Sequence, residues 1–205
     1  NMVRATLDIV ADSAVPASAV VGLSDVRVVN TRGAHRMILG GEVDLTDVEY
    51  RAAAMHLEGP TASARMDRLT LAGPLVRARG GATITITDSW LELYDGQREN
   101  VADVQGGSLT VRRSRLRGGL AALAIEAGDL TLDRVWSTGH VRTVTATASQ
   151  IQANDIYSSA DAMLFSLGER GRAQITRVAA ERSSYVVVTG DTDSIDLSDV
   201  HSIDG

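Results

Sequence analysis

The sequence of 205 residues contains no cysteine and no lysine. Without cysteine the chain can form neither disulfide bonds nor a thiolate metal site. All twenty basic residues are arginine and are scattered along the chain, and the net charge of −6 argues against a nucleic-acid-binding surface. No apolar run is long enough to span a bilayer, and no basic, apolar and small-residue leader opens the chain.

Aromatic residues are also scarce, with two Trp, four Tyr and one Phe. A compact globule normally uses more aromatic side chains to fill its centre. A thin core lined by Val, Ile, Leu and Ala needs fewer. The composition therefore favours one elongated array over a thick globular core.

Short β-rich runs recur about every 20–25 residues, and this repeat predicts the fold. Each run has two apolar positions separated by a polar residue or glycine, and a third, mostly apolar position follows three residues later. The first position is occupied in successive repeats by Val21, Val43, Ala64, Ile84, Leu109, Leu130, Ile151, Ala173 and Ile195. Period-two alternation indicates a strand with one buried face, and the change of spacing from two to three indicates a bend.

Each repeat also carries a second apolar run, such as 121–125 or 185–188, and most repeats close near a glycine. Glycine there permits the positive φ that a corner needs. No repeat can bury its apolar face alone, so stacking must supply the core. We predict an all-β fold, a right-handed parallel β-helix of about nine coils over residues 21–205, after an irregular coil or cap at 1–20. We expect the chain to be a fragment of a longer protein, because it stops partway through a coil.

The runs 107–119 (GSLTVRRSRLRGG) and 128–135 (GDLTLDRV) resemble coils of known right-handed β-helices. They are similar to the pectin-lyase-like superfamily, many of whose members act on polysaccharides. They are closest in character to the passengers of pertactin-type autotransporters, which cross a membrane unfolded and suit a chain without cysteine. The resemblance implies an exported protein at the cell surface or outside the cell, with the periplasm as the alternative compartment.

One outward column is expected to carry large aromatic side chains. It reads Arg27, Glu49, Thr70, Trp90, Arg115, Trp136, Tyr157, Ala179 and His201. Stacked strands lie about 4.8 Å apart, so Trp90, Arg115, Trp136 and Tyr157 would form one exposed strip across consecutive coils. Such a strip is a candidate sugar platform or protein-binding patch. The alternative is an aromatic and cation–π ladder that only stiffens the surface.

A second column, at the bend, is charged in every repeat. It reads Asp25, Asp47, Arg68, Asp88, Arg113, Arg134, Asp155, Arg177 and Asp199. Opposite charges would be neighbours at six of the eight steps between coils. We interpret the column as surface ion pairs that help to set the register of the coils.

An insertion at 94–101 lengthens the coil that begins at Ile84. Insertions in solenoids become loops on one face and often bind ligands. The insertion is expected to bring together five charged residues, Glu92, Asp95, Arg98, Glu99 and Asp103. A solvated loop without function is the alternative.

No pattern in the sequence identifies a catalytic, metal or cofactor site. The four His residues lack zinc-site spacing, and neither Asp191 with Asp193 nor the acids of the insertion match a defined calcium loop. We therefore expect a non-catalytic binding or structural module of an exported surface protein, such as an adhesin, with a protein or polysaccharide ligand. The alternative is a polysaccharide-active lyase, hydrolase or epimerase domain.

Overall fold

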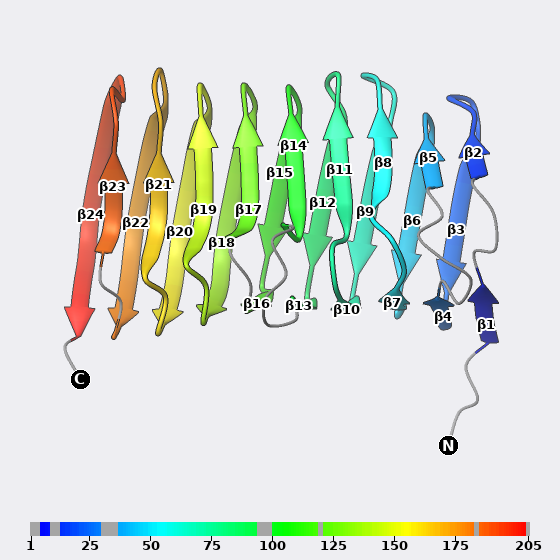
Figure 1. Cartoon of the computed structure of the whole chain (residues 1–205), viewed down its shortest axis with the longest axis horizontal. Coiled ribbons are helices and arrows are strands. Elements are labelled where there is room, and N and C mark those ends of the chain that lie inside the picture. The colour runs from blue at the N-terminus through cyan, green and yellow to red at the C-terminus, as the bar shows by residue number, and fades with distance from the viewer. Residues whose placement is uncertain are drawn as a thin grey trace.

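The computed structural model describes residues 5–8, 13–29, 37–93, 100–118, 121–182 and 185–203. These residues form a parallel β-solenoid of about eight turns, close to the nine coils expected from the sequence, and contain no helix. The coils stand side by side in one row from β1 to β24 (Figure 1). The predicted all-β solenoid is therefore confirmed.

A small parallel sheet of nine strands is built from the second apolar runs of successive coils. Its strands follow chain order and are β2 (Ser13–Val15), β5 (Met37–Leu39), β8 (Met55–Glu58), β11 (Val76–Arg79), β14 (Ala102–Gln105), β17 (Ala121–Glu126), β19 (Arg142–Thr147), β21 (Met163–Leu167) and β23 (Tyr185–Thr189). Parallel pairing of neighbouring coils leaves apolar side chains pointing into one shared core.

The large sheet has fifteen strands and contains the first apolar run of each repeat together with the segment after the bend. Before the bend lie β3 (Val20–Ser24), β6 (Glu42–Thr46), β9 (Ser63–Asp67), β12 (Thr83–Thr87) and β15 (Ser108–Arg112). After the bend lie β1 (Ala5–Asp8), β4 (Val26–Val29), β7 (Glu49–Arg51), β10 (Thr70–Ala72), β13 (Trp90–Glu92) and β16 (Arg115–Arg117). In the later coils both parts form one strand: β18 (Asp129–Thr138), β20 (Gln150–Ser159), β22 (Arg172–Glu181) and β24 (Ser194–Ile203).

The strand register confirms the columns predicted from the sequence. Ile84 pairs with Ala64 on one side and with Leu109 on the other, as the first column requires. Members of that column from Val43 to Ala173 are buried, whereas Val21 and Ile195, near the two ends, are only partly buried. The core is therefore a narrow stack of aliphatic side chains, which explains how the chain folds with so few aromatic residues.

Two serines interrupt the third apolar column, and both are buried. The hydroxyl of Ser89 accepts a hydrogen bond from the backbone N–H of Leu69 at 3.0 Å, and the hydroxyl of Ser114 accepts one from the N–H of Ser89 at 3.1 Å. Each hydroxyl also donates to a backbone carbonyl of its own coil. A buried polar group costs little when it is hydrogen-bonded in this way, so serine replaces an apolar residue here without breaking the stack.

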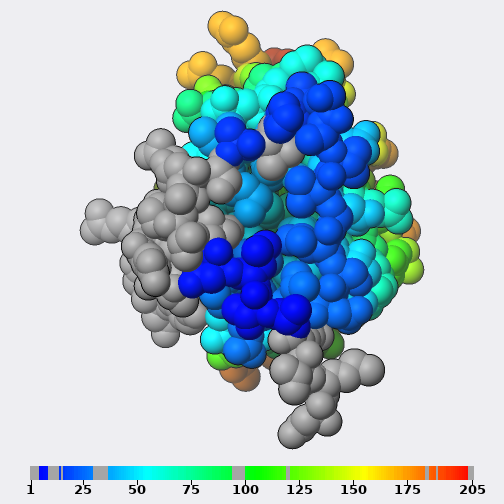
Figure 2. All heavy atoms as spheres, turned by 90° about the vertical axis from the view of Figure 1, so that its right-hand side faces the viewer, coloured from blue at the N-terminus to red at the C-terminus, as the bar shows by residue number. Residues whose placement is uncertain are grey.

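Residues 1–20, expected as an irregular coil or cap, contribute two short strands. β1 pairs with β4, and β2 pairs with β5. Figure 2 looks onto this end of the solenoid, with the first coils in blue. None of the described residues belongs to a helix that is long and apolar enough to cross a membrane.

Candidate functional site

The predicted strip is built by four adjacent strands of the large sheet. In the strand register Trp90 of β13 pairs with Arg115 of β16, Arg115 pairs with Trp136 of β18, and Trp136 pairs with Tyr157 of β20. Each of the four lies two residues after a bend residue. The residue between them points into the core, so the strip residue points away from it. The structure thus brings together the residues that the column placed on one face.

Arg115 lies between the two indole rings. Its guanidinium carbon lies 5.6 Å from the ring centroid of Trp90 and 5.7 Å from that of Trp136, and it lies over both rings. One face of each indole is therefore turned along the solenoid towards the guanidinium. Trp90 remains 38% exposed and Trp136 49% exposed, so both rings also contact solvent.

Arg115 differs from Arg113 and Arg117, the nearest arginines of its coil, in what its guanidinium faces. Arg113 makes an ion pair with Asp88 at 2.7 Å, and Arg117 lies 3.7 Å from Glu92. Arg115 makes no ion pair with any described residue, and its guanidinium lies over the two rings. Arg115 is also exposed, so a ligand can reach the N–H groups of its guanidinium.

Tyr157 at the end of the strip is tied to the next coil. Its hydroxyl donates a hydrogen bond to Oε2 of Glu181 at 2.6 Å, and this bond to a carboxylate raises the pKa of Tyr157. Its hydroxyl is therefore already committed within the protein. The side chains of Trp90, Arg115 and Trp136 form no comparable hydrogen bond with a described residue.

The expected cluster of charges around the insertion can be described only in part. Asp95, Arg98 and Glu99 lie outside the described residues. Glu92 belongs to the large sheet, whereas Asp103 lies in the small sheet between Arg77 and Ala124. The two carboxylates at the ends of the insertion thus stand on different sheets, and a ligand role for the five residues remains a prediction.

The charged column at the bend has a backbone conformation that its residue types did not reveal. All nine residues have φ between 46° and 56°, the left-handed region in which most side chains are strained. Ion pairs join neighbouring coils, for example Arg68 to Asp47 at 2.7 Å and Arg177 to Asp155 at 2.5 Å. Arg134 instead pairs with Asp133 of its own coil at 3.0 Å. Ion pairing between coils is therefore confirmed for some of the predicted steps.

A buried polar cluster escaped the sequence analysis altogether. The carboxylate of Asp161, which is 1% exposed, accepts hydrogen bonds from the backbone N–H of His140 at 2.7 Å and from the hydroxyls of Thr143 at 3.0 Å and Ser158 at 2.7 Å. The Ser137 hydroxyl lies 2.8 Å from that of Thr143. The cluster links two corners of successive coils, and its burial indicates a structural role.

The ring of His140 belongs to the same corner and is 2% exposed. Neither ring nitrogen has a hydrogen-bond partner of ordinary geometry among the described residues. Burial lowers the pKa of His140, and this effect outweighs the opposing influence of the Asp161 charge and of the nearby backbone of Leu116 and Gly118. The side chain is therefore held in its neutral form at neutral pH.

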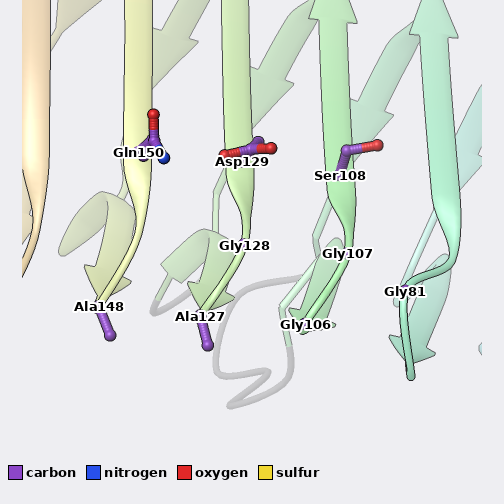
Figure 3. A pocket seen from close by; sticks show the side chains of 9 residues that line it. All are labelled: Gly81, Gly106, Gly107, Ser108, Ala127, Gly128, Asp129, Ala148 and Gln150. Carbon is purple, nitrogen blue, oxygen red and sulfur yellow. The ribbon is translucent and has the colours of Figure 1, made fainter.

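One surface hollow, of about 400 Å³, follows a corner of consecutive coils (Figure 3). Its backbone is glycine-rich because the coils approach closely: a Cβ on Gly107 would lie 2.3 Å from the carbonyl oxygen of Ala82, and one on Gly128 would lie 2.4 Å from that of Gly107. Ala127, and not Gly128, has the positive φ at its corner. Gly107 and Gly128 are thus explained by coil stacking, whereas Gly81 and Gly106 have a positive φ of 94° and 66°. Among the described residues no three acidic, His or Cys side chains are grouped to hold a metal ion.

Comparison of the chain with protein-family models, with curated proteins and with solved structures finds no match. The class of the protein therefore follows from the fold alone, and it is a parallel β-solenoid.

Proposed function

We propose that this chain is a non-catalytic binding module whose ligand contacts the strip of Trp90, Arg115, Trp136 and Tyr157. The observation that carries the proposal is Arg115, which lies between two exposed indoles without an ion-pair partner among the described residues. An exposed Trp is costly to leave in water and offers a large contact area. Trp and Arg are also the residues most enriched at the energetic centres of interfaces.

The same reasoning favours binding over catalysis. Hydrolysis of a glycosidic bond normally uses two carboxylates on either side of that bond. Glu92 is close to Arg117, and Asp103 stands on the other sheet, so the two described candidates do not form such a pair. A rigid solenoid with a pre-ordered strip is well suited to binding, because little side-chain freedom is lost when a ligand docks.

We further propose that the module belongs to an exported surface protein of the adhesin or autotransporter-passenger type. The support is the resemblance of its coils to pertactin-type passengers and the absence of cysteine. The cell surface or the extracellular space is the proposed location, with the periplasm as the alternative. An extended solenoid of this kind presents long lateral faces to partners.

The proposal is tested by removing both rings in a Trp90→Ala, Trp136→Ala double variant. Wild type and variant are applied to immobilised neutral and acidic polysaccharides and to purified surface and matrix proteins. Tyr185→Ala is the matched control, because Tyr185 is an exposed aromatic residue of the small sheet, outside the strip. We expect the double variant to keep its circular dichroism spectrum and lose binding, while the control keeps both.

Three results would contradict this function. Undiminished binding by the double variant would place the ligand elsewhere, and loss of the folded spectrum would make the strip structural. Turnover of any polysaccharide by the wild-type protein, with or without Ca²⁺, would favour the enzymatic alternative.

A further inference from the structure

We infer that the strip recognises a protein, and that Arg115 binds an Asp or Glu side chain of that protein. This inference rests on the proposed function and specifies the partner. It depends on three observations: the available donors of Arg115, the direction of the ring faces, and the charges of the neighbouring coils.

The guanidinium of Arg115 is prepared for a carboxylate. A guanidinium has five N–H donors in a planar fork that matches the two oxygens of a carboxylate. The indoles of Trp90 and Trp136 cover it on two sides at 5.6 and 5.7 Å and limit the directions in which it can turn. Indole rings accept no conventional hydrogen bond, so they orient the cation while leaving its donors unused.

The same column shows what an arginine does when an internal partner is present. Arg27, four coils earlier, donates to Glu49 of the next coil at 2.9 Å. Arg115 has an indole at each corresponding neighbouring position. A carboxylate supplied from outside would take the place that Glu49 occupies beside Arg27.

The ring faces favour a protein over a polysaccharide. A sugar platform needs aromatic faces turned outward, whereas here one face of each indole is turned along the solenoid towards Arg115. The exposed parts of the strip are the two partly accessible indole rings and the guanidinium between them. This combination suits an acidic side chain that is flanked by apolar ones. The net charge of −6 and the carboxylates beside Arg113 and Arg117 also oppose a densely charged polyanion.

The test is a selection of displayed random dodecapeptides on the wild-type protein, followed by affinity measurements with the enriched peptides. We expect enrichment of Asp or Glu next to apolar residues. Arg115→Gln should weaken these peptides roughly tenfold or more, because a hydrogen bond to a charged group is lost. Arg117→Gln is the matched control on the same strand and should change affinity less than about twofold, since rim charges contribute little. Arg115→Glu should instead enrich Lys or Arg.

The outcomes separate this inference from the function on which it rests. Peptides that bind equally well to the Trp90→Ala, Trp136→Ala variant would contradict both. Peptides that require the two rings but carry no acidic residue would refute the carboxylate partner and leave the binding strip intact. Failure to enrich acidic peptides, together with ring-dependent binding of a polysaccharide, would assign the strip to sugars and overturn the inference.

Discussion

The carboxylate of Asp161 is expected to be the most costly polar group to remove from this fold. In Asp161→Ala three buried donors lose their acceptor: the backbone N–H of His140 and the hydroxyls of Thr143 and Ser158. The N–H cannot move to another acceptor, and an unsatisfied buried donor costs about 1–3 kcal/mol. The two hydroxyls can rotate, so each costs about 0.5–1.5 kcal/mol, the net value of an ordinary hydrogen bond. We therefore expect a total loss of about 2–6 kcal/mol in the free energy of unfolding.

Urea denaturation followed by circular dichroism measures this loss, and thermal melting gives a second readout. A chain of this size loses about 2–4 °C of melting temperature per kcal/mol. Asp161→Asn retains one acceptor oxygen and should lose less than Asp161→Ala. Asp129→Ala, at an exposed position of β18, is the control and should change stability by less than about 0.5 kcal/mol. A loss below about 1 kcal/mol in Asp161→Ala would show that the cluster does not organise this corner.

Three further predictions concern the stack of coils. Because burial lowers the pKa of His140 below the ordinary 6.5, the unfolded chain takes up a proton that the folded chain does not. The free energy of unfolding should therefore fall as the pH drops below about 6.5, by at most about 1.4 kcal/mol per pH unit from this group. His140→Leu should reduce that slope. His201→Gln, at an exposed site, should leave the slope unchanged. Ile86→Asp buries an unpaired carboxylate and should lower the free energy of unfolding by more than about 4 kcal/mol or prevent folding. Thr85→Asp, on the outward side of the same strand, should keep a normal urea midpoint. Equal midpoints for the two variants would refute the register. Arg113→Val should be less stable than Arg113→Asn by about 1–3 kcal/mol in the same urea assay. Both variants lose the ion pair, but only valine is strongly strained at φ 46°. Equal stabilities would contradict the strain argument.

The regular part of this fold could be predicted from the sequence because residues at the same position of each repeat stack in register. The pairing of Ile84 with Ala64 and Leu109 follows directly from the apolar alternation. The alignment of Trp90 with Arg115 and Trp136 follows from the same count. In a solenoid, a contact between coils is a contact between residues about one repeat apart, so local periodicity predicts long-range structure.

The remainder depends on information that periodicity does not contain. Thr143 is hydrogen-bonded to both Asp161 and Ser137, which come from different coils and different positions of the repeat, so no column indicates this cluster. Ser137 occupies the inward position of Leu116 in the previous coil, yet a serine in an alternating run normally suggests solvent exposure. The direction of the Trp90 ring is set by a side-chain torsion, which no sequence column contains, and in the structure a face of this ring is turned towards Arg115.

The central claim is that a partner docks on the strip, and tryptophan fluorescence tests it most directly. Trp90 and Trp136 are the only tryptophans of the chain, so all of its tryptophan emission comes from the strip. Titration of the wild-type protein with an enriched acidic peptide should change the emission with the same dissociation constant that calorimetry gives. The same titration of Arg115→Gln should give a dissociation constant roughly tenfold or more higher. Calorimetric binding without any change in emission would place the partner away from the strip and contradict the account.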